Sequence, residues 1–345
     1  MPEMKSPVSR KNVEFARMSD IAERAGVSLM TVSRALRLPS KVAPATLAKI
    51  QAVANELGYV PNLVAGALAG QRSGFIVVII PNLKAEIYSE CVEGITKVCE
   101  AKGLRILLGS SGYSLETEYK LLESLMSYRP SGVILTGHTH LPEVKELIER
   151  YSLPVVETFN LTDNPIRACV GYSNFRALYE MTEILIRRGC KDIVHLCTDY
   201  TPNDRNADRR AGYAAAMREN GFPETAIRFL PTEFTYAGAG HAVADYLAKS
   251  DHRPDGLVCG GDILAIGALL YCQKQGIKVP NEIAIAGFDD LELSSILQPS
   301  ITTVRVPRRV MGEAAARHLI RQIEGHSSRQ NIIDLGYEIM MRETA

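Results

Sequence analysis

The sequence predicts an all-α helix-turn-helix head followed by an α/β body of two Rossmann-like lobes, each built on a parallel sheet. Short helical segments with periodic apolar residues fill 18–61, whereas strand-like runs alternate with amphipathic helices from residue 74 onward. The length of 345 residues also allows two or three domains. We therefore expect a disordered arm over 1–17, the head over 18–61, a connecting segment over 62–73 and the body over 74–345.

Three short helices are expected in the head. Residues 18–25 place their apolar side chains on one helical face, and Gly26 ends that run. Ser28 is suited to cap a second helix, because its hydroxyl can accept a backbone N–H of the first turn. Pro44 suits the first turn of a third helix, which Gly58 stops. A glycine-containing turn between the first two helices is typical of a helix-turn-helix unit.

The connecting segment differs from its neighbours in composition. Residues 62–70 carry almost no charge, and Gly66 lowers their helical propensity. The segment is also shorter than the ~12–15 residues that an isolated helix needs in water. We expect it to be unfolded when it stands alone.

The body consists of repeated strand–helix units in two series. Near-continuous Val/Ile strands indicate parallel sheets that are covered on both faces. The two series predict lobe 1 over about 74–171 and 304–330, and lobe 2 over about 172–303 and 331–345. Ligands of open parallel sheets bind beyond the carboxyl ends of the strands, so the loops there should line a cleft between the lobes. The expected strands are 75–80, 105–109, 132–136, 154–158, 168–172, 192–197, 227–230, 255–260 and 282–288.

The charges are balanced overall but divided unevenly. The chain has 39 basic and 39 acidic side chains, yet residues 1–72 hold ten Lys and Arg against five Asp and Glu. A basic head on a slightly acidic body indicates that one end meets a polyanion, although a basic tail that merely aids solubility would look the same.

The cysteines and the apolar runs restrict the location and the class of the protein. The seven cysteines form no C-x-x-C pair, so neither a disulfide framework nor a thiolate metal site is expected. The N-terminus lacks the apolar core of a signal peptide, and no run approaches the ~18 apolar residues of a membrane-spanning helix. We expect a cytoplasmic protein with no cofactor, no metal and no membrane partner.

Several motifs resemble the LacI/GalR family of transcriptional regulators. The run MSDIAERAGVSLMTVSRAL (18–36), followed by Pro44, LGY (57–59), Pro61 and Asn62, is similar to the family's DNA-binding head. Further similarities are R-x-A-G at Arg209–Gly212, AIAGFDD at Ala284–Asp290 and the final Glu343-Thr344. The resemblance implies a repressor with a periplasmic-binding-protein-like body. It also implies a homodimer, or a dimer of dimers, on a palindromic operator in double-stranded DNA.

The resemblance assigns DNA contacts to residues in the second helix and beyond it. An α-helix fits the major groove, where Leu29 and Met30 can meet thymine methyl groups and Arg34 can meet guanine or phosphate. The alternative for Leu29 and Met30 is burial in the head's core, the usual place of apolar residues. The implied contacts are Met18, Ser28, Leu29, Met30, Thr31, Ser33, Arg34, Asn62, Ala65 and Leu68.

The connecting segment acquires a role through the same resemblance. Residues 62–73 would form a hinge helix and linker, and two hinge helices of a dimer would enter the minor groove, where Leu68 separates a base step. The alternative is a plain flexible linker. The family usually has a Thr that caps the first helix where this chain has Arg17, so capping is expected to pass to Ser19 or Asp20.

The resemblance also assigns residues to an effector site in the cleft. Arg209 would act as a forked donor and Asp289 as an acceptor from hydroxyl groups, whereas without the resemblance both would more often be solvated charges or an ion pair. Many family members that bind sugars have Asn where this chain has Gly261, which places ordinary hexose effectors in doubt. The predicted effector-binding residues are Tyr88, His138, Glu157, Arg209 and Asp289.

Three runs resemble the branch of the family that represses gluconate or ketogluconate catabolism: LTGHTH (135–140), VGYSNF (170–175) and IIDLGY (332–337). A sugar acid needs a cation for its carboxylate, which Arg209 can supply as a two-pronged donor. His138 and His140 can add donors. As alternatives, they could form a weak metal site without an evident third ligand, or be exposed loop residues.

Two other classes of function remain to be compared with a repressor. A Rossmann-type enzyme would carry a cofactor or nucleophile motif, but G-x-G-x-x-G, the P-loop, G-x-S-x-G and H-E-x-x-H are all missing. A sugar-binding transport protein would share the two-lobed body but would need a signal peptide. We therefore expect a regulator without catalytic residues.

Overall fold

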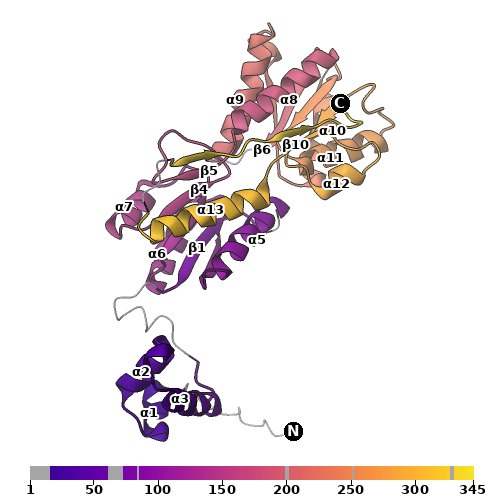
Figure 1. Cartoon of the computed structure of the whole chain (residues 1–345). Coiled ribbons are helices and arrows are strands. Elements are labelled where there is room, and N and C mark those ends of the chain that lie inside the picture. The colour runs from indigo at the N-terminus through magenta and orange to yellow at the C-terminus, as the bar shows by residue number, and fades with distance from the viewer. Residues whose placement is uncertain (1–15, 61–72, 84, 199–201, 251, 327–329) are drawn as a thin grey trace, which may run out of the picture. The chain divides into compact units, whose positions relative to one another are not determined.

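The computed structural model describes residues 16–345 apart from 61–72, 84, 199–201, 251 and 327–329, and it divides into two compact units (Figure 1). The first unit ends at Gln71 and the second begins at Arg72. The expected hinge helix and nearly all of the expected arm lie outside the described residues. Within the described part, no helix has the length and apolar character needed to cross a membrane.

The first unit holds the three predicted helices around a small apolar core. Ile21, Val32 and Ile50, one from each helix, are all fully buried there. These side chains recur at helical spacing, so each short helix turns its apolar face towards the other two. The elements are α1 (Met18–Ala25), α2 (Leu29–Arg37), a 3-10 turn (Pro39–Lys41) and α3 (Pro44–Glu56).

The turn between α1 and α2 follows the expected residue pattern. Gly26 adopts φ +63°, a left-handed conformation that glycine takes without steric cost, and it ends α1. The Ser28 hydroxyl accepts the Thr31 N–H at 3.1 Å, which confirms Ser28 as the cap of α2. The cap position of α1 does not move to Ser19 or Asp20, because the helix begins directly after Arg17; Asp20 in the first turn instead accepts the Arg17 N–H at 2.7 Å through Oδ2.

Lobe 1 of the second unit is a six-stranded parallel sheet with helices on both faces. Along β1, Ile76 and Val78 pack towards α5 and α13, whereas Val77 and Ile79 pack towards α6 and α7. Burial on both faces explains the unbroken apolar sequence of this strand. The sheet order is β11-β5-β4-β3-β1-β2. The elements are β1 (Phe75–Ile80), α5 (Glu86–Glu100), β2 (Arg105–Ser110), α6 (Leu115–Leu125), a 3-10 turn (Met126–Tyr128), β3 (Gly132–Thr136), α7 (Pro142–Arg150), β4 (Val155–Thr158), β5 (Cys169–Gly171), α13 (Arg308–Ile323) and β11 (Ile332–Asp334).

Lobe 2 is a four-stranded parallel sheet in the order β7-β6-β8-β9. Helices α8 and α9 pack on one face and α10 and α11 on the other. A Cβ at Gly212 would lie 2.1 Å from the carbonyl oxygen of Phe175, so only glycine lets α9 approach α8 this closely. The elements are α8 (Asn174–Arg188), β6 (Ile193–Thr198), α9 (Asp204–Glu219), a 3-10 turn (Glu224–Ala226), β7 (Arg228–Thr232), α10 (Tyr236–Lys249), β8 (Gly256–Cys259), α11 (Asp262–Lys274), β9 (Ala284–Ala286) and α12 (Glu292–Ile296).

The C-terminal segment corrects one expected lobe boundary. Residues 331–345 were expected in lobe 2, but β11 pairs in parallel with β5 at the edge of the lobe 1 sheet. The chain then forms β12 (Glu338–Met340), antiparallel to β10 (Thr303–Arg305), and returns to lobe 2, where the Ile285 N–H donates to the Thr344 carbonyl. A strand of three residues carries too little periodicity to indicate which of two similar sheets it joins.

Candidate DNA-binding surface and effector cavity

The second helix of the head presents its first residues to solvent. Leu29 is 52% exposed and Met30 is 70% exposed, while Val32 and Ala35 of the same helix fill the core. The alternative that placed Leu29 and Met30 in the core is therefore wrong. Two large apolar side chains at the exposed start of a helix are available to contact the edges of bases.

The other predicted DNA-contact residues have mixed surroundings. Arg34 and Ser28 are exposed, and Thr31 and Ser33 are partly buried. Met18 is partly buried and packs against the head's core, so only part of its surface is free to meet DNA. Three further residues lie outside the described residues: Asn62, Ala65 and Leu68.

A small polar cavity lies where the carboxyl ends of the strands of both lobes meet. Tyr88 follows β1, Arg209 lies on the helix that follows β6, and Asp289 follows β9. These three predicted effector residues come together here, as expected for ligand sites of parallel sheets. The lining residues are Ile87, Tyr88, Tyr113, Phe159, Thr198, Asn203, Arg205, Asn206, Arg209, Phe234, Gly260 and Asp289.

The guanidinium of Arg209 is held from several sides. Nε donates to Asn174 Oδ1 at 2.9 Å, and Nη1 donates to the Gly260 carbonyl at 2.6 Å. The central carbon of the guanidinium, Cζ, lies 3.6 Å from the centroid of the Phe288 ring, and Nη2 is 3.9 Å from Asp289 Oδ1. These contacts fix the orientation of a buried cation that also faces the cavity.

Asp289 is a buried carboxylate with unused hydrogen-bonding capacity. It is 2% exposed, and its Oδ1 has no hydrogen-bond partner among the described residues. Burial raises the pKa of this carboxyl to about 6, although Arg209 and Arg308 oppose the shift. Its φ of +109° is unusual for a residue other than glycine, and such backbone strain clusters at ligand sites. An acceptor of this kind is suited to a ligand hydroxyl.

Aromatic rings supply the apolar wall of the cavity. The Tyr88 and Phe159 rings meet edge to face at 5.0 Å, and the Tyr88 hydroxyl lies 3.4 Å from that of Tyr113. A Cβ at Gly261 would lie 2.6 Å from the Phe234 ring. Phe234 therefore occupies the space that a larger residue at position 261 would need, which explains the departure noted in the sequence.

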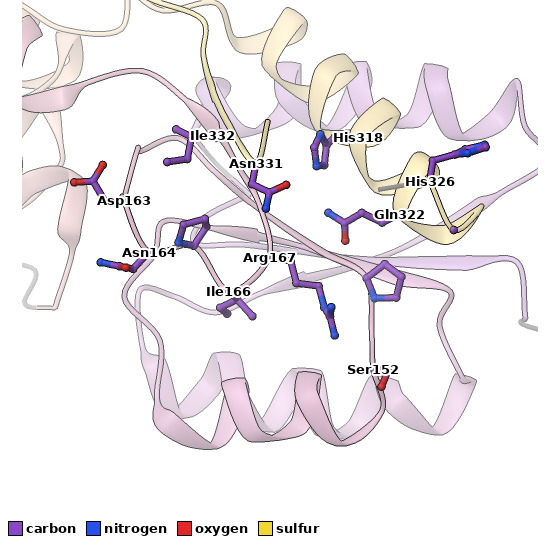
Figure 2. A pocket seen from close by; sticks show the side chains of 13 residues that line it. Ser152, Asp163, Asn164, Ile166, Arg167, His318, Gln322, His326, Asn331 and Ile332 are labelled. Atoms are coloured by element: carbon purple, nitrogen blue, oxygen red, sulfur yellow. The ribbon is translucent and has the colours of Figure 1, made fainter. Parts of the chain in front are cut away.

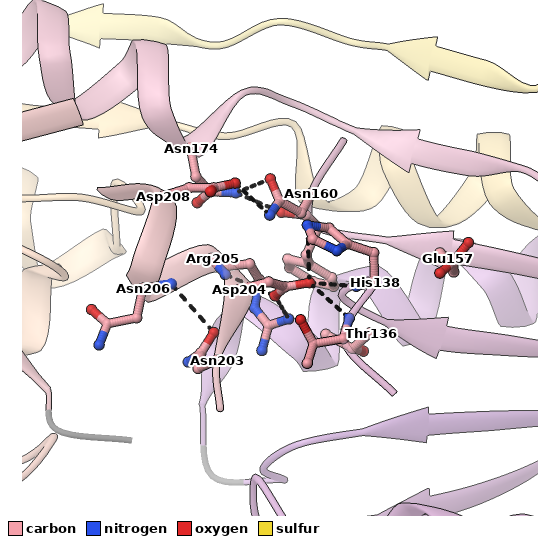
Figure 3. A network of polar contacts seen from close by, with 12 residues as sticks. Thr136, His138, Glu157, Asn160, Asn174, Asn203, Asp204, Arg205, Asn206 and Asp208 are labelled. Atoms are coloured by element: carbon pink, nitrogen blue, oxygen red, sulfur yellow. Dashed lines mark hydrogen bonds and ion pairs between the residues drawn. The ribbon is translucent and has the colours of Figure 1, made fainter. Parts of the chain in front are cut away.

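Arg205, which no pattern in the sequence indicated, also lines the cavity one helical turn before Arg209. Its Nη1 donates to Asp204 Oδ1 at 2.7 Å. Asp204 Oδ2 in turn accepts the backbone N–H groups of His138 and Thr139 in lobe 1 (Figure 3). The pKa of Asp204 is lowered despite burial, because Arg205 and the His138 N–H stabilise its charge. The loop after β3 is thus held by a carboxylate of α9.

A second set of contacts joins the lobes beside Asp204. Asn160, which follows β4, donates to Asp208 Oδ2 at 2.8 Å and accepts from Asn174 Nδ2 at 3.1 Å (Figure 3). Asn174 is the residue that also orients Arg209. The ligand-facing cation and the contacts between the lobes are therefore members of one hydrogen-bonded network.

Two of the predicted effector residues do not line this cavity. Glu157 is 2% exposed on β4, accepts the Ile166 N–H at 2.7 Å, and lies apart from the bonded network in Figure 3. His138 instead lies over Asp204, with its Nε2 3.5 Å from Oδ2. The sequence showed that both follow or end a strand, but it could not show which side of the sheet edge they reach.

His140 is a buried partner of Glu157, so the alternative that placed it as an exposed loop residue is wrong. Its Nδ1 is 2.6 Å from Glu118 Oε1, and its Nε2 is 3.5 Å from Glu157 Oε1. Burial opposes the charged imidazole, but these two carboxylates raise the pKa of His140 to about 9. The cluster is a buried ion network. Among the described residues, no group of three or more His, Cys, Asp or Glu side chains has the arrangement of a metal site.

A larger and more open cavity lies in lobe 1 at the C-terminal end of α13 (Figure 2). Its polar side chains include Arg167, His318 and Gln322. The side-chain amide of Gln322 already bonds to the backbone of Val155: its Oε1 accepts the Val155 N–H, and its Nε2 donates to the Val155 carbonyl. None of the predicted effector residues lines this cavity.

The fold and the two sites together define a class of protein. A helix-turn-helix head with an exposed recognition helix, on a chain whose body encloses a small polar cavity, is the architecture of ligand-binding transcriptional regulators. The family model for bacterial regulatory proteins of the lacI family matches residues 17–62, and that for a periplasmic binding protein-like domain matches 182–345. The chain belongs to the LacI family of transcriptional repressors, and it is a regulator, not an enzyme.

Relatives of known name cover almost the whole chain. The HTH-type transcriptional regulator GntR of Escherichia coli K12 is 34% identical over 322 residues, which cover 93% of this chain and 96% of the relative. GntR of Pseudomonas aeruginosa is 33% identical over 95% of both chains. A LacI-family regulator from Silicibacter pomeroyi is similar in structure, with a TM-score of 0.87, 33% identity, and coverage of 95% of this chain and 99% of that one.

Proposed function

We propose that this repressor binds a palindromic operator as a homodimer, or as a dimer of dimers, in the cytoplasm, and that a small sugar acid of the gluconate type releases it. The observation that carries the effector class is the composition of the cavity. Two buried guanidinium groups, of Arg205 and Arg209, face it together with a buried carboxylate, that of Asp289. Cations suit a carboxylate ligand, and an unpaired acceptor suits a hydroxyl group.

The remaining lining residues support a polyhydroxylated ligand. Asn203 and Asn206 bring amide groups to the cavity, while Tyr88 and Phe159 supply an apolar wall. A ligand with one carboxylate and several hydroxyls matches this distribution better than a purine, which offers a flat ring and no carboxylate. The resemblance of three sequence runs to repressors of gluconate catabolism supports the same class.

The head supports the DNA part of the proposal. Leu29, Met30 and Arg34 would contact bases in the major groove, while Ser28, Thr31, Ser33 and Asn62 would contact phosphates. Paired hinge helices would bring Ala65 and Leu68 into the minor groove. Two such heads related by symmetry would bind the two half-sites of an inverted repeat.

Effector control follows from differential affinity for two arrangements of the lobes. Asp204 and Asp208 join the lobes beside the ligand cavity, so a bound ligand changes the stability of these contacts. A ligand acts on operator binding only through such a difference, and a tenfold loss of operator affinity needs ~1.4 kcal/mol of coupling.

A thermal-shift screen tests the effector class on the purified full-length chain. Gluconate, 2-ketogluconate, glucose, sorbitol and guanine should be compared at equal concentration, because a ligand that binds the native state raises Tm. We expect the acids to raise Tm more than any of the neutral compounds does and to release the protein from an inverted-repeat duplex selected from a random library. Stabilisation by glucose or guanine, without stabilisation by the acids, would refute the effector class.

A salt titration tests the DNA part separately. Operator affinity should fall with a log–log slope of about −0.9 for each phosphate neutralised. A flat response, or equal affinity for selected and random duplexes, would refute specific operator binding.

A further inference from the structure

The cavity holds two arginines that differ in how their nitrogens are used. Arg205 and Arg209 lie four residues apart on α9, so they project from the same face of the helix. Both line the cavity and both are at least nine-tenths buried. A single carboxylate ligand needs only one forked partner, and the hydrogen bonds already made distinguish the two candidates.

Arg209 has more of its donors bound to the protein than Arg205 has. Its Nε and Nη1 donate to Asn174 and to the Gly260 carbonyl, and its Nη2 faces Asp289. The pair is better suited to a hydroxyl group, which can accept from the arginine and donate to the aspartate.

Arg205 retains donors that the described residues do not use. Its side chain is 9% exposed and bonds through Nη1 to Asp204 alone; within the described part of the chain, neither Nε nor Nη2 has a partner. Asp204 balances its charge, and the same carboxylate also accepts two backbone N–H groups of lobe 1. The tyrosines Tyr88 and Tyr113 lie within electrostatic range and can add hydroxyl donors. A buried cation with unused, forked donors matches the geometry of a carboxylate.

The lobe 1 loop that packs against Asp204 and Arg205 has a glycine, Gly137, at the point of closest approach. Gly137 has φ +83°, and a Cβ there would lie 2.2 Å from Arg205 Nη1 and 2.7 Å from the oxygens of Asp204. The Asp204–Arg205 pair therefore packs directly beneath the lobe 1 loop.

We infer that Arg205, rather than Arg209, selects an anionic effector by binding its carboxylate, while Arg209 and Asp289 bind its hydroxyl groups; this rests on the proposed sugar-acid function. Asp204 couples binding of the ligand carboxylate to the contacts between the lobes, because it bonds both to Arg205 and to the backbone of the 137–139 loop. Arg205 is thus the residue that distinguishes a sugar acid from the neutral alcohol of the same shape.

The test compares gluconate with sorbitol, its neutral counterpart, by isothermal titration calorimetry on the full chain. Arg205→Gln should lower gluconate affinity on the order of 10- to 100-fold, the effect of losing hydrogen bonds to a charged group, and leave sorbitol affinity nearly unchanged. Arg209→Gln should weaken both ligands to a similar extent. Arg218→Gln is the matched control, since it removes the same charge from an exposed position of the same helix.

The outcomes separate this inference from the proposed function. If the unmodified chain binds no sugar acid, the proposed function fails and the inference fails with it. If it binds gluconate, but Arg205→Gln keeps the preference for the acid and Arg209→Gln loses it, the inference alone is overturned. Should Arg205→Gln fail to fold, Arg205→Lys keeps the charge without the fork. It should lose part of the preference for gluconate, whereas full retention of that preference would overturn the inference.

Discussion

The head and the body of this repressor place their functional side chains in opposite surroundings. Leu29 and Met30 stand exposed at the start of α2, whereas Arg209 and Asp289 are buried in the body. The difference follows from the size of the partner. DNA brings its own large surface to an exposed helix, while a small ligand must be enclosed and desolvated before charged groups hold it firmly.

This difference has consequences for mutation. An exposed recognition residue contributes to binding and hardly to stability. A buried residue that lines the cavity is also part of the packing and of the contacts between the lobes, as Arg209 is through Asn174 and Asn160. Substitutions in the head should therefore separate binding from stability, and substitutions in the body should affect both.

The largest effect is expected at His140, deep in the body. His140→Ala leaves the buried carboxylates of Glu118 and Glu157 without their shared cation, which should cost about 3–5 kcal/mol of unfolding free energy. Differential scanning calorimetry should show a lower Tm for the body transition only. His241→Ala, at an exposed position, is the control; equal shifts for both variants would contradict the buried ion network.

The same histidine predicts a pH dependence. Its pKa is raised in the folded state to about 9, so its contribution to stability is fully present below ~6.5, the ordinary pKa of histidine, and is lost as the pH rises through about 9. The body's Tm should fall between pH 7 and pH 9.5, and the fall should be smaller in the His140→Ala variant. If Tm fell equally in the unmodified chain and in the His140→Ala variant, titration of groups other than His140 would cause the loss of stability.

The next largest effect is expected at Arg209. Arg209→Ala removes the cation beside Asp289 and leaves Asn174 and the Gly260 carbonyl without their donor. Loss of one member of a buried charged pair weakens binding by about 2–5 kcal/mol, at least roughly 30-fold. Titration calorimetry with gluconate measures this loss, and an unchanged affinity would show that the ligand binds elsewhere.

A smaller effect is expected in the head at Arg34. If Arg34 reaches a guanine, Arg34→Ala should cost about 1–3 kcal/mol of operator affinity and relax the preference at one base pair. Fluorescence anisotropy on duplexes changed at single positions measures both quantities. A uniform loss on every duplex, with a salt slope smaller by about 1, would instead place Arg34 on a phosphate.

The smallest effect on stability is expected at Met30. This variant tests most directly whether substitutions in the head separate DNA binding from stability. Because Met30 is 70% exposed, Met30→Ala should change the head's unfolding free energy by less than about 0.5 kcal/mol while lowering operator affinity. Ile50→Ala, in the head's core, should instead cost about 2–5 kcal/mol. If Met30→Ala lowered the head's unfolding free energy as much as Ile50→Ala does, Met30 would be part of the core and not a DNA-contact residue.

The predicted features that the structure confirms share one property, which is that they depend on neighbours in sequence. Ser28 caps α2, Gly26 ends α1, and Pro44 begins α3, because capping and turn conformations are local. The alternation of apolar strands with amphipathic helices likewise predicted two parallel sheets, since each period reflects which face of an element is buried. The lobe that β11 joins could not be predicted in this way.

The effector cavity shows the same division more sharply. Position after a strand, together with the family resemblance, was sufficient to select Tyr88, Arg209 and Asp289. The same reasoning selected Glu157, which the structure places in the ion network of His140, and it passed over Arg205 and Phe234. No local pattern distinguishes Arg205 from the neighbouring Arg210, which packs on the Phe229 ring.

The sequence by itself determined the order of the two regions, the three helices of the head, the parallel sheets and the edge at which a ligand would bind. Only the tertiary structure decided which charged side chains face the cavity, which ones pair with each other, and which residues of one lobe hold the other. The physical reason is range: helix periods and caps act over a few residues, whereas burial and charge pairing depend on groups that folding brings together from opposite ends of the chain.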